Sequence, residues 1–142
     1  MKFNTKNRYK GFTLLELMIT LLIVAILTVI AVTSYNYFIK QSRLNGAESD
    51  LVNMSTVMSS YYQQQLSYPA VTTTTATTQT ALSGWLPTQS AYFTYIISAS
   101  PGTTYTLQAT GISGTQMAGY TVTITNANVR GGTMPGGAAI SW

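Results

Sequence analysis

The stretch that decides the fold is Lys10-Gly11-Phe12-Thr13-Leu14-Leu15-Glu16, which opens an apolar run that continues to Val32. Only three threonines and Glu16 interrupt the hydrophobic side chains of this run. A helix over residues 12–32 rises about 30 Å, which is the thickness of the hydrocarbon core of a bilayer. The sequence therefore predicts a membrane-spanning helix with one carboxylate, Glu16, near its start.

A short basic segment precedes the apolar run. It contains four cations, a number equal to the formal net charge of +4, and they are Lys2, Lys6, Arg8 and Lys10. Because no cation directly follows Val32, the positive-inside rule places residues 1–11 in the cytoplasm and the C-terminal part across the membrane. A conventional secretory signal carries its cleavage site after the apolar stretch, whereas Gly11 stands before it. Cleavage after Gly11 would therefore remove the leader and keep the apolar segment.

The order of basic leader, glycine, phenylalanine and glutamate resembles the processing site of type IV prepilins and related pseudopilins. Gly11-Phe12-Thr13-Leu14-Leu15-Glu16 carries the resemblance, which covers residues 8–65 specifically. It implies that a prepilin peptidase cuts between Gly11 and Phe12 and methylates the new amine of Phe12. It also implies that Glu16 pairs with the N-terminal amine of a neighbouring subunit. The alternative is an uncleaved membrane anchor with Glu16 at the interface.

A charge pair at Glu16 has a physical reason. A mid-membrane carboxylate costs about 2.5–3.5 kcal/mol on insertion scales, and the helix dipole lowers this cost near a helix start. In an apolar bundle, paired charges satisfy each other, whereas a subunit in the wrong axial register leaves one charge unpaired. We therefore expect Glu16 to set the register of assembly.

The helical pattern continues beyond the apolar run, with apolar residues at alternating spacings of three and four. These form one stripe of an amphipathic helix, and we expect them to pack on the domain: Leu44, Ala47, Leu51, Met54, Met58 and Tyr61. No proline occurs before Pro69, so one helix of roughly 80 Å is predicted from about Phe12 to about Gln65, with residues 33–66 as its amphipathic continuation. Thr33 stands where many type IV pilins carry a proline, which argues against the kink associated with that proline.

The rest of the chain predicts a loop and then a small sheet. Residues 67–90 are predicted to form a threonine-rich surface loop, because they lack apolar periodicity. This loop is either a solvated connection or a patch for contacts or O-glycosylation. Residues 91–142 alternate β-rich segments with turn signals, which predicts an antiparallel meander. The expected strands lie at 91–99, 103–110 and 120–126, with a fourth near 128–130, and the turn signals include Pro101-Gly102 and residues 112–114.

The predicted fold class is therefore α+β, with a long N-terminal helix packed on a small antiparallel β-meander, as in the pilin fold. Type IVa minor pilins, which the chain resembles most, commonly close their C-terminal region with a disulfide. This chain has no cysteine and ends at Ser141-Trp142. Its last segment must therefore be held by packing and backbone pairing, and we expect it to be mobile.

The composition argues against an enzyme. There is no cysteine or histidine, and no acid or lysine follows Asp50. The chain therefore lacks the usual bases that activate a serine or threonine, so we expect no catalytic residue, cofactor or metal site. Glu48 and Asp50 are not spaced as a metal-binding pair on a helix. We expect them to be solvated or paired with Lys40 or Arg43 of a neighbour.

The expected function is that of a structural subunit, a pilin or minor pilin, of a type IV pilus. Its expected partners are other pilin subunits, a prepilin peptidase, an assembly platform and the bacterial inner membrane, which it spans once before assembly into a filament. One alternative is a minor pseudopilin of a type II secretion system, since the acids with which major pseudopilins often bind calcium are missing after Asp50. The other is a DNA-uptake pilin. Arg130 is the only cation after Asp50, which argues against strong direct binding of nucleic acid.

Overall fold

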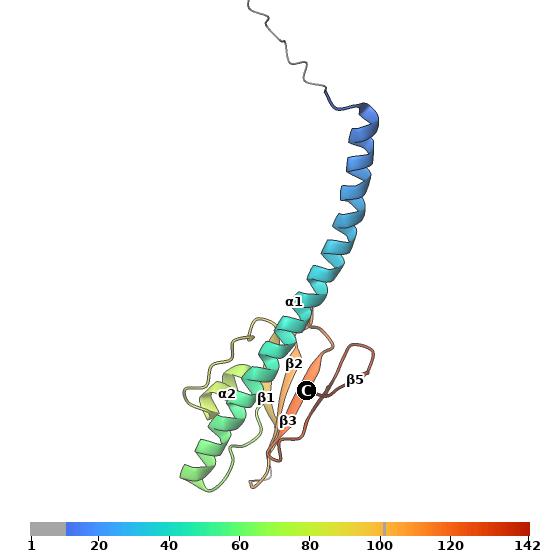
Figure 1. Ribbon diagram of the computed structural model, residues 1–142. Coiled ribbons are helices and arrows are strands. Elements are labelled where there is room, and N and C mark those ends of the chain that lie inside the picture. Colours follow the sequence, from blue (N-terminus) through green and yellow to red (C-terminus); the bar gives the residue numbers. More distant parts are fainter. Residues whose placement is uncertain (1–10, 101) are drawn as a thin grey trace, which may run out of the picture. The chain divides into compact units, whose positions relative to one another are not determined.

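The computed structural model describes residues 11–100 and 102–142, so the basic leader upstream of Gly11 and Pro101 of the predicted turn lie outside the described residues. The chain divides into two compact units, Met1–Phe38 and Ile39–Trp142. Helix α1, Leu14–Gln65, contributes to both units (Figure 1). It begins two residues later than predicted and ends where predicted.

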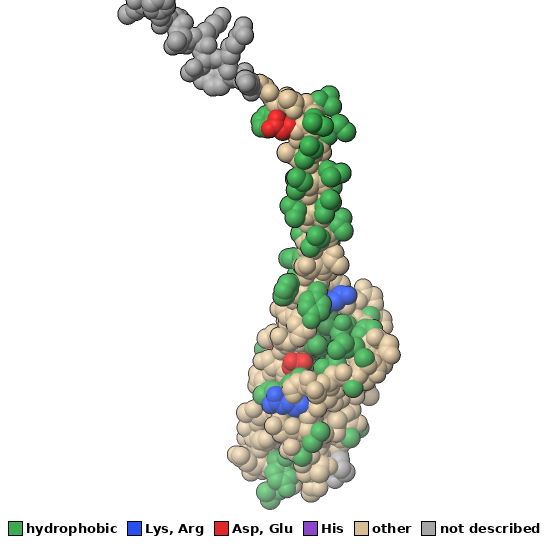
Figure 2. All heavy atoms as spheres, turned by 45° about the vertical axis from the view of Figure 1, so that its right-hand side comes forward, with side chains coloured by type: hydrophobic (Ala, Val, Ile, Leu, Met, Phe, Trp, Pro, Cys, Tyr) green, Lys and Arg blue, Asp and Glu red, His purple; other side chains and the backbone are tan. Residues whose placement is uncertain are grey.

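The first unit contains the apolar part of α1, whose side chains are exposed in the single chain (Figure 2). This helix is long and apolar enough to cross a membrane by length and composition. The hydroxyls of Thr20, Thr28 and Thr33 donate to the backbone carbonyls of Leu17, Val24 and Val29 over 2.9, 2.7 and 2.6 Å. Such bonds satisfy polar side chains within an apolar helix. The helix is continuous through Thr33.

The second unit packs the rest of α1 on a five-stranded antiparallel sheet. The strands lie in sequence order and are β1 Phe93–Ala99, β2 Thr106–Gly111, β3 Thr121–Thr125, β4 Arg130–Thr133 and β5 Ala139–Ile140. Each of the first three overlaps its predicted segment. The predicted fourth strand, near 128–130, meets β4 only at Arg130, and β5 was not predicted. The predicted count of three or four strands was therefore too low, because β4 and β5 are short and β4 contains Gly131-Gly132, so neither has a strong strand signal.

Glycine in β4 has a steric reason. Gly132 pairs with Val122 of β3, and a Cβ on Gly132 would collide with the carbonyl oxygen of Thr121. The residue that weakens the strand signal is therefore the one that lets the two strands approach.

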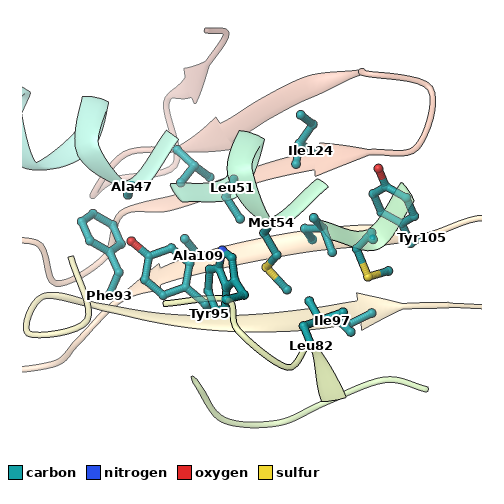
Figure 3. Close-up of a cluster of buried hydrophobic side chains, with 14 of the residues drawn as sticks. Ala47, Leu51, Met54, Leu82, Phe93, Tyr95, Ile97, Tyr105, Ala109 and Ile124 are labelled. Atoms are coloured by element: carbon teal, nitrogen blue, oxygen red, sulfur yellow. The ribbon is translucent and has the colours of Figure 1, made fainter. Parts of the chain in front are cut away.

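The core lies between α1 and the inner face of the sheet (Figure 3). Side chains from α1 meet alternate residues of β1, β2 and β3, while Leu82 and Trp85 come from the segment between α2 and β1. Burial of one large apolar side chain contributes about 1.5–3 kcal/mol. The fully buried large residues include Leu51, Met54, Met58, Phe93, Tyr95, Ile97 and Leu107.

The threonine-rich segment is not a plain loop, and this prediction was wrong. It contains a second helix, α2, Thr75–Ala81, which starts with a capping box between Thr74 and Thr77. In Figure 1, α2 lies beside β1. Its hydroxyl groups, rather than an apolar stripe, hold it in place, so apolar periodicity could not reveal it.

Other threonines of this segment pair with the outer edge of β1. The Ile97 N–H donates to Thr72 Oγ1 over 2.8 Å, and the Thr72 N–H donates to the Ile97 carbonyl over 3.0 Å. The Tyr95 N–H donates to Thr75 Oγ1 over 3.0 Å, and Thr78 Oγ1 donates to the Tyr95 carbonyl over 2.9 Å. An unpaired edge is a template for unwanted strand pairing, and these bonds cover it.

The C-terminal segment is held by backbone pairing and by its aromatic residue. β5 pairs with β4 through Gly132 with Ile140 and Thr133 with Ala139. The indole Nε1 of Trp142 donates to the Gly131 carbonyl over 3.2 Å. These contacts replace a disulfide at the end of the chain.

Candidate processing and assembly segment

The predicted processing segment lies at the start of α1. Gly11, Phe12 and Thr13 precede the helix and are exposed. The Thr13 carbonyl accepts the N–H of Leu17 over 3.2 Å, and Thr13 Oγ1 accepts the N–H of Glu16 over 3.2 Å. Thr13 is therefore the helix cap, and Glu16 lies in the first helical turn.

Within residues 11–38, the surroundings of Glu16 suit an anion but supply no positive side chain. The carboxylate lies at the end of the helix where the dipole is positive, and it is exposed. Residues 11–38 contain no lysine or arginine. A cationic partner for Glu16 from within this range could therefore only be an amine created by cleavage, on this chain or another.

The predicted packing stripe lies on the buried face of α1. Its first five members are 0–5% exposed, and Tyr61 is half-buried against the same core. They pack against the sheet, so their arrangement is that of a hydrophobic core.

Asp50 is a residue that sequence reasoning placed wrongly. The prediction is that Asp50 is solvated or paired with Lys40 or Arg43 of a neighbour, but it is 5% exposed. Its carboxylate accepts the N–H of Thr88 over 2.9 and 3.0 Å, the N–H of Gln89 over 3.0 Å and the Thr88 hydroxyl over 3.0 Å. It also accepts the Tyr95 hydroxyl over 2.6 Å. These bonds attach the segment before β1 to α1, and they satisfy the buried charge without a cation.

The sequence did contain a signal for this position. Asp50 stands three residues after Ala47 and four before Met54, so it lies on the buried stripe. Its surroundings also act on Tyr95, because burial and the hydrogen bond to the Asp50 carboxylate raise the pKa of that phenol well above its usual range.

Arg43 has partners within the chain. Its guanidinium lies 3.7 Å from the centre of the Tyr92 ring. It donates to the Tyr92 hydroxyl and to Gln116 Oε1, each over 3.1 Å.

Burial raises the pKa of Glu48, and the positive charge of Arg130 partly opposes this effect.

Family comparisons match two parts of the chain. Residues 6–32 match a prokaryotic N-terminal methylation motif. Residues 33–121 match the family described as type IV minor pilin ComP, DNA uptake sequence receptor.

A curated relative gives a further similarity. The type IV major pilin protein PilA of Myxococcus xanthus (strain DK1622) is 36% identical over 67 residues, which cover 47% of this chain and 30% of the relative's own length. No solved structure matches the chain. Since the ComP family model covers more than half of the 142 residues, the chain belongs to the type IV pilins, in the family of the minor pilin ComP.

Proposed function

We propose that the chain is a minor subunit of a type IV pilus, made as a prepilin, cleaved between Gly11 and Phe12, methylated at Phe12 and assembled through α1. The observation that carries this proposal is the contrast between the two parts of α1. The large apolar side chains from Phe12 to Val32 are 50–78% exposed, whereas the stripe from Leu44 to Met58 is buried. An apolar helix of this length needs lipid or other apolar helices around it.

These two environments indicate which partners α1 has before assembly and which it has afterwards. Before assembly the apolar helix crosses the inner membrane, with the leader on the cytoplasmic side where the peptidase acts. After cleavage, equivalent helices of other pilin subunits replace lipid around it, with the help of an inner-membrane assembly platform. Glu16 then pairs with the Phe12 amine of a neighbour and sets the register, because an apolar bundle leaves a misplaced charge unpaired.

The test of the minor role is a subunit count in sheared, purified filaments, made with a quantified peptide from the second unit. We expect the chain to be present at a small fraction of the main subunit and to disappear from the sheared fraction when the main subunit is deleted. A chain that forms most of the filament mass would contradict a minor role. A chain that is absent from filaments while abundant in the membrane would contradict assembly itself.

Binding of DNA is a second candidate function, and the distribution of charge in the second unit favours it. The second unit begins at Ile39, so it also includes Lys40 and Arg43. Among its acids, Asp50 is buried and internally bonded, which leaves Glu48 as the acid nearest the surface. The described surface of this unit is therefore weakly positive.

Two of these cations lie beside aromatic rings, an arrangement that can contact phosphate and stack on bases. Arg43 lies over Tyr92, and the Arg130 guanidinium lies 4.8 Å from the centre of the Trp142 ring. The family description names a DNA uptake sequence receptor, and these pairs are the groups of this chain that fit such a ligand.

We predict weak, salt-sensitive binding of duplex DNA by residues 39–142. Because this unit has three cations, the slope of log affinity against log salt should be no steeper than about −2.7, which is about −0.9 for each phosphate contact. Gel-shift titrations between about 50 and 200 mM salt measure this slope. Arg130→Gln should weaken binding and reduce the slope by about one contact, whereas Thr73→Val, a neutral exposed control, should change neither. No retarded band at the lowest salt would contradict this second function.

A further inference from the structure

The start of α1 contains a helix cap at Thr13, the residue before Leu14. Thr13 accepts the first helical hydrogen bond, from Leu17, with its carbonyl, and it accepts the Glu16 N–H with its hydroxyl, each over 3.2 Å. The spacing Thr-Leu-Leu-Glu is that of a capping box. The Thr13 hydroxyl thus satisfies one of the N–H groups at the helix start that have no partner inside the helix.

The peptide bond between Gly11 and Phe12 lies just outside this cap. Both residues are non-helical, and the Phe12 side chain is 78% exposed. Together with Thr13 and Glu16, they line a shallow hollow. A Cβ on Gly11 would meet no atom within 4 Å. The described part of the chain therefore does not itself require glycine at this position, so such a requirement would come from whatever binds the bond.

A peptidase has to reach a bond that the neighbouring sequence tends to bury in a helix. In lipid, every backbone polar group needs an internal partner, which favours extension of the apolar helix in both directions. One further helical turn upstream of Leu14 would include the Gly11–Phe12 bond. Proteolysis concentrates at exposed segments outside regular structure, so the helix has to stop before this bond.

We propose that Thr13 is a positioning residue for the processing reaction. Its hydroxyl fixes the helix start at Leu14 and keeps the Gly11–Phe12 bond outside the helix, where a peptidase can bind it. This inference rests on the proposed cleavage at Gly11.

Thr13 takes no part in the bond changes. In the cleavage, water adds to the Gly11 carbonyl carbon, and the bond from that carbon to the Phe12 nitrogen breaks. The products are a Gly11 carboxylate and a Phe12 amine, which receives the proton. The contribution of Thr13 is to the fraction of precursor in which this bond is accessible.

The test is the rate of processing of the full-length chain in membranes by a prepilin peptidase, with four variants of Thr13. Thr13→Ser and Thr13→Asn keep a capping group and should be cleaved within about twofold of the parent rate. Thr13→Ala and Thr13→Val should be cleaved about fivefold more slowly, the factor that corresponds to the typical loss of an N-cap. Valine has the shape of threonine without its hydroxyl. Cleavage of Thr13→Val at the parent rate, or of Thr13→Ser and Thr13→Asn as slowly as Thr13→Ala, would overturn the proposal.

A second measurement separates this proposal from the function on which it rests. Amide hydrogen exchange in detergent micelles should show an unprotected Leu15 N–H in the parent chain and in Thr13→Ser, and exchange about fivefold slower in Thr13→Val, because a helix extended upstream bonds this N–H to the Gly11 carbonyl. Equal exchange in the three chains would overturn the cap. If the parent chain is not cleaved at Gly11 at all, the proposed processing fails, while the exchange data still decide whether Thr13 fixes the helix start.

Discussion

Glu16→Ala is expected to reduce incorporation of the chain into filaments by at least tenfold, while the precursor still inserts in the membrane and is still cleaved. On the proposed pairing, the substitution leaves the neighbour's Phe12 amine without its partner inside an apolar bundle. Removal of one member of a buried charge pair costs about 3–5 kcal/mol, and about 1.4 kcal/mol already corresponds to a factor of ten. The measurement is the ratio of the chain in sheared filaments to the chain in membranes.

Two features of the structure make Glu16→Ala a specific test of the carboxylate. The bond from the Thr13 hydroxyl to residue 16 uses the backbone N–H, which alanine retains. Glu48→Ala is the matched control, because Glu48 is an acid of the same helix that lies in the second unit. It should enter filaments at the parent level. Normal incorporation of Glu16→Ala would show that the carboxylate does not set the register.

The second large effect is on folding. Asp50→Ala is expected to lower the free energy of unfolding of the second unit by about 3–5 kcal/mol, because it leaves the N–H groups of Thr88 and Gln89 and the hydroxyl of Tyr95 without their acceptor. A small domain has only about 5–15 kcal/mol in total. Asp50→Asn keeps one acceptor oxygen and should cost less, about 1–3 kcal/mol.

Urea unfolding of residues 39–142, followed by circular dichroism, measures this difference. Glu48→Gln is the control on the same helix, since Glu48 is half-buried and accepts no comparable set of bonds. It should unfold close to the parent midpoint or slightly above, because burial disfavours its charged form. An unchanged midpoint for Asp50→Ala would mean that the carboxylate does not hold the segment before β1.

Periodicity predicted the long helix and its buried face, because both depend on apolar residues at regular spacing along one segment. The processing motif was equally visible, since its residues are contiguous. The same residues contain the spacing of the cap at Thr13, which is Thr-x-x-Glu before an apolar run. Its proposed link to processing depends on where the helix starts, which this spacing alone does not give.

The features that sequence reasoning missed depend on contacts between distant polar groups. The hydroxyls of Thr72 and Thr75 pair with the edge of β1, 25 and 20 residues later, and a run of threonines does not reveal this. β5 comprises only Ala139–Ile140, too short for an alternating pattern. Asp50 was excluded from the core by its charge, although its position on the stripe and its partners at residues 88, 89 and 95 place it there.

We propose that the Gly11–Phe12 bond divides a leader from a filament subunit. Mass spectrometry of the N-terminal peptide of the chain, purified from cells with a prepilin peptidase, shows whether this bond is cut. We expect a peptide that begins at Phe12 and carries one methyl group on its amine. A peptide that retains the leader intact in the mature protein would show that the Gly11–Phe12 bond is not cut.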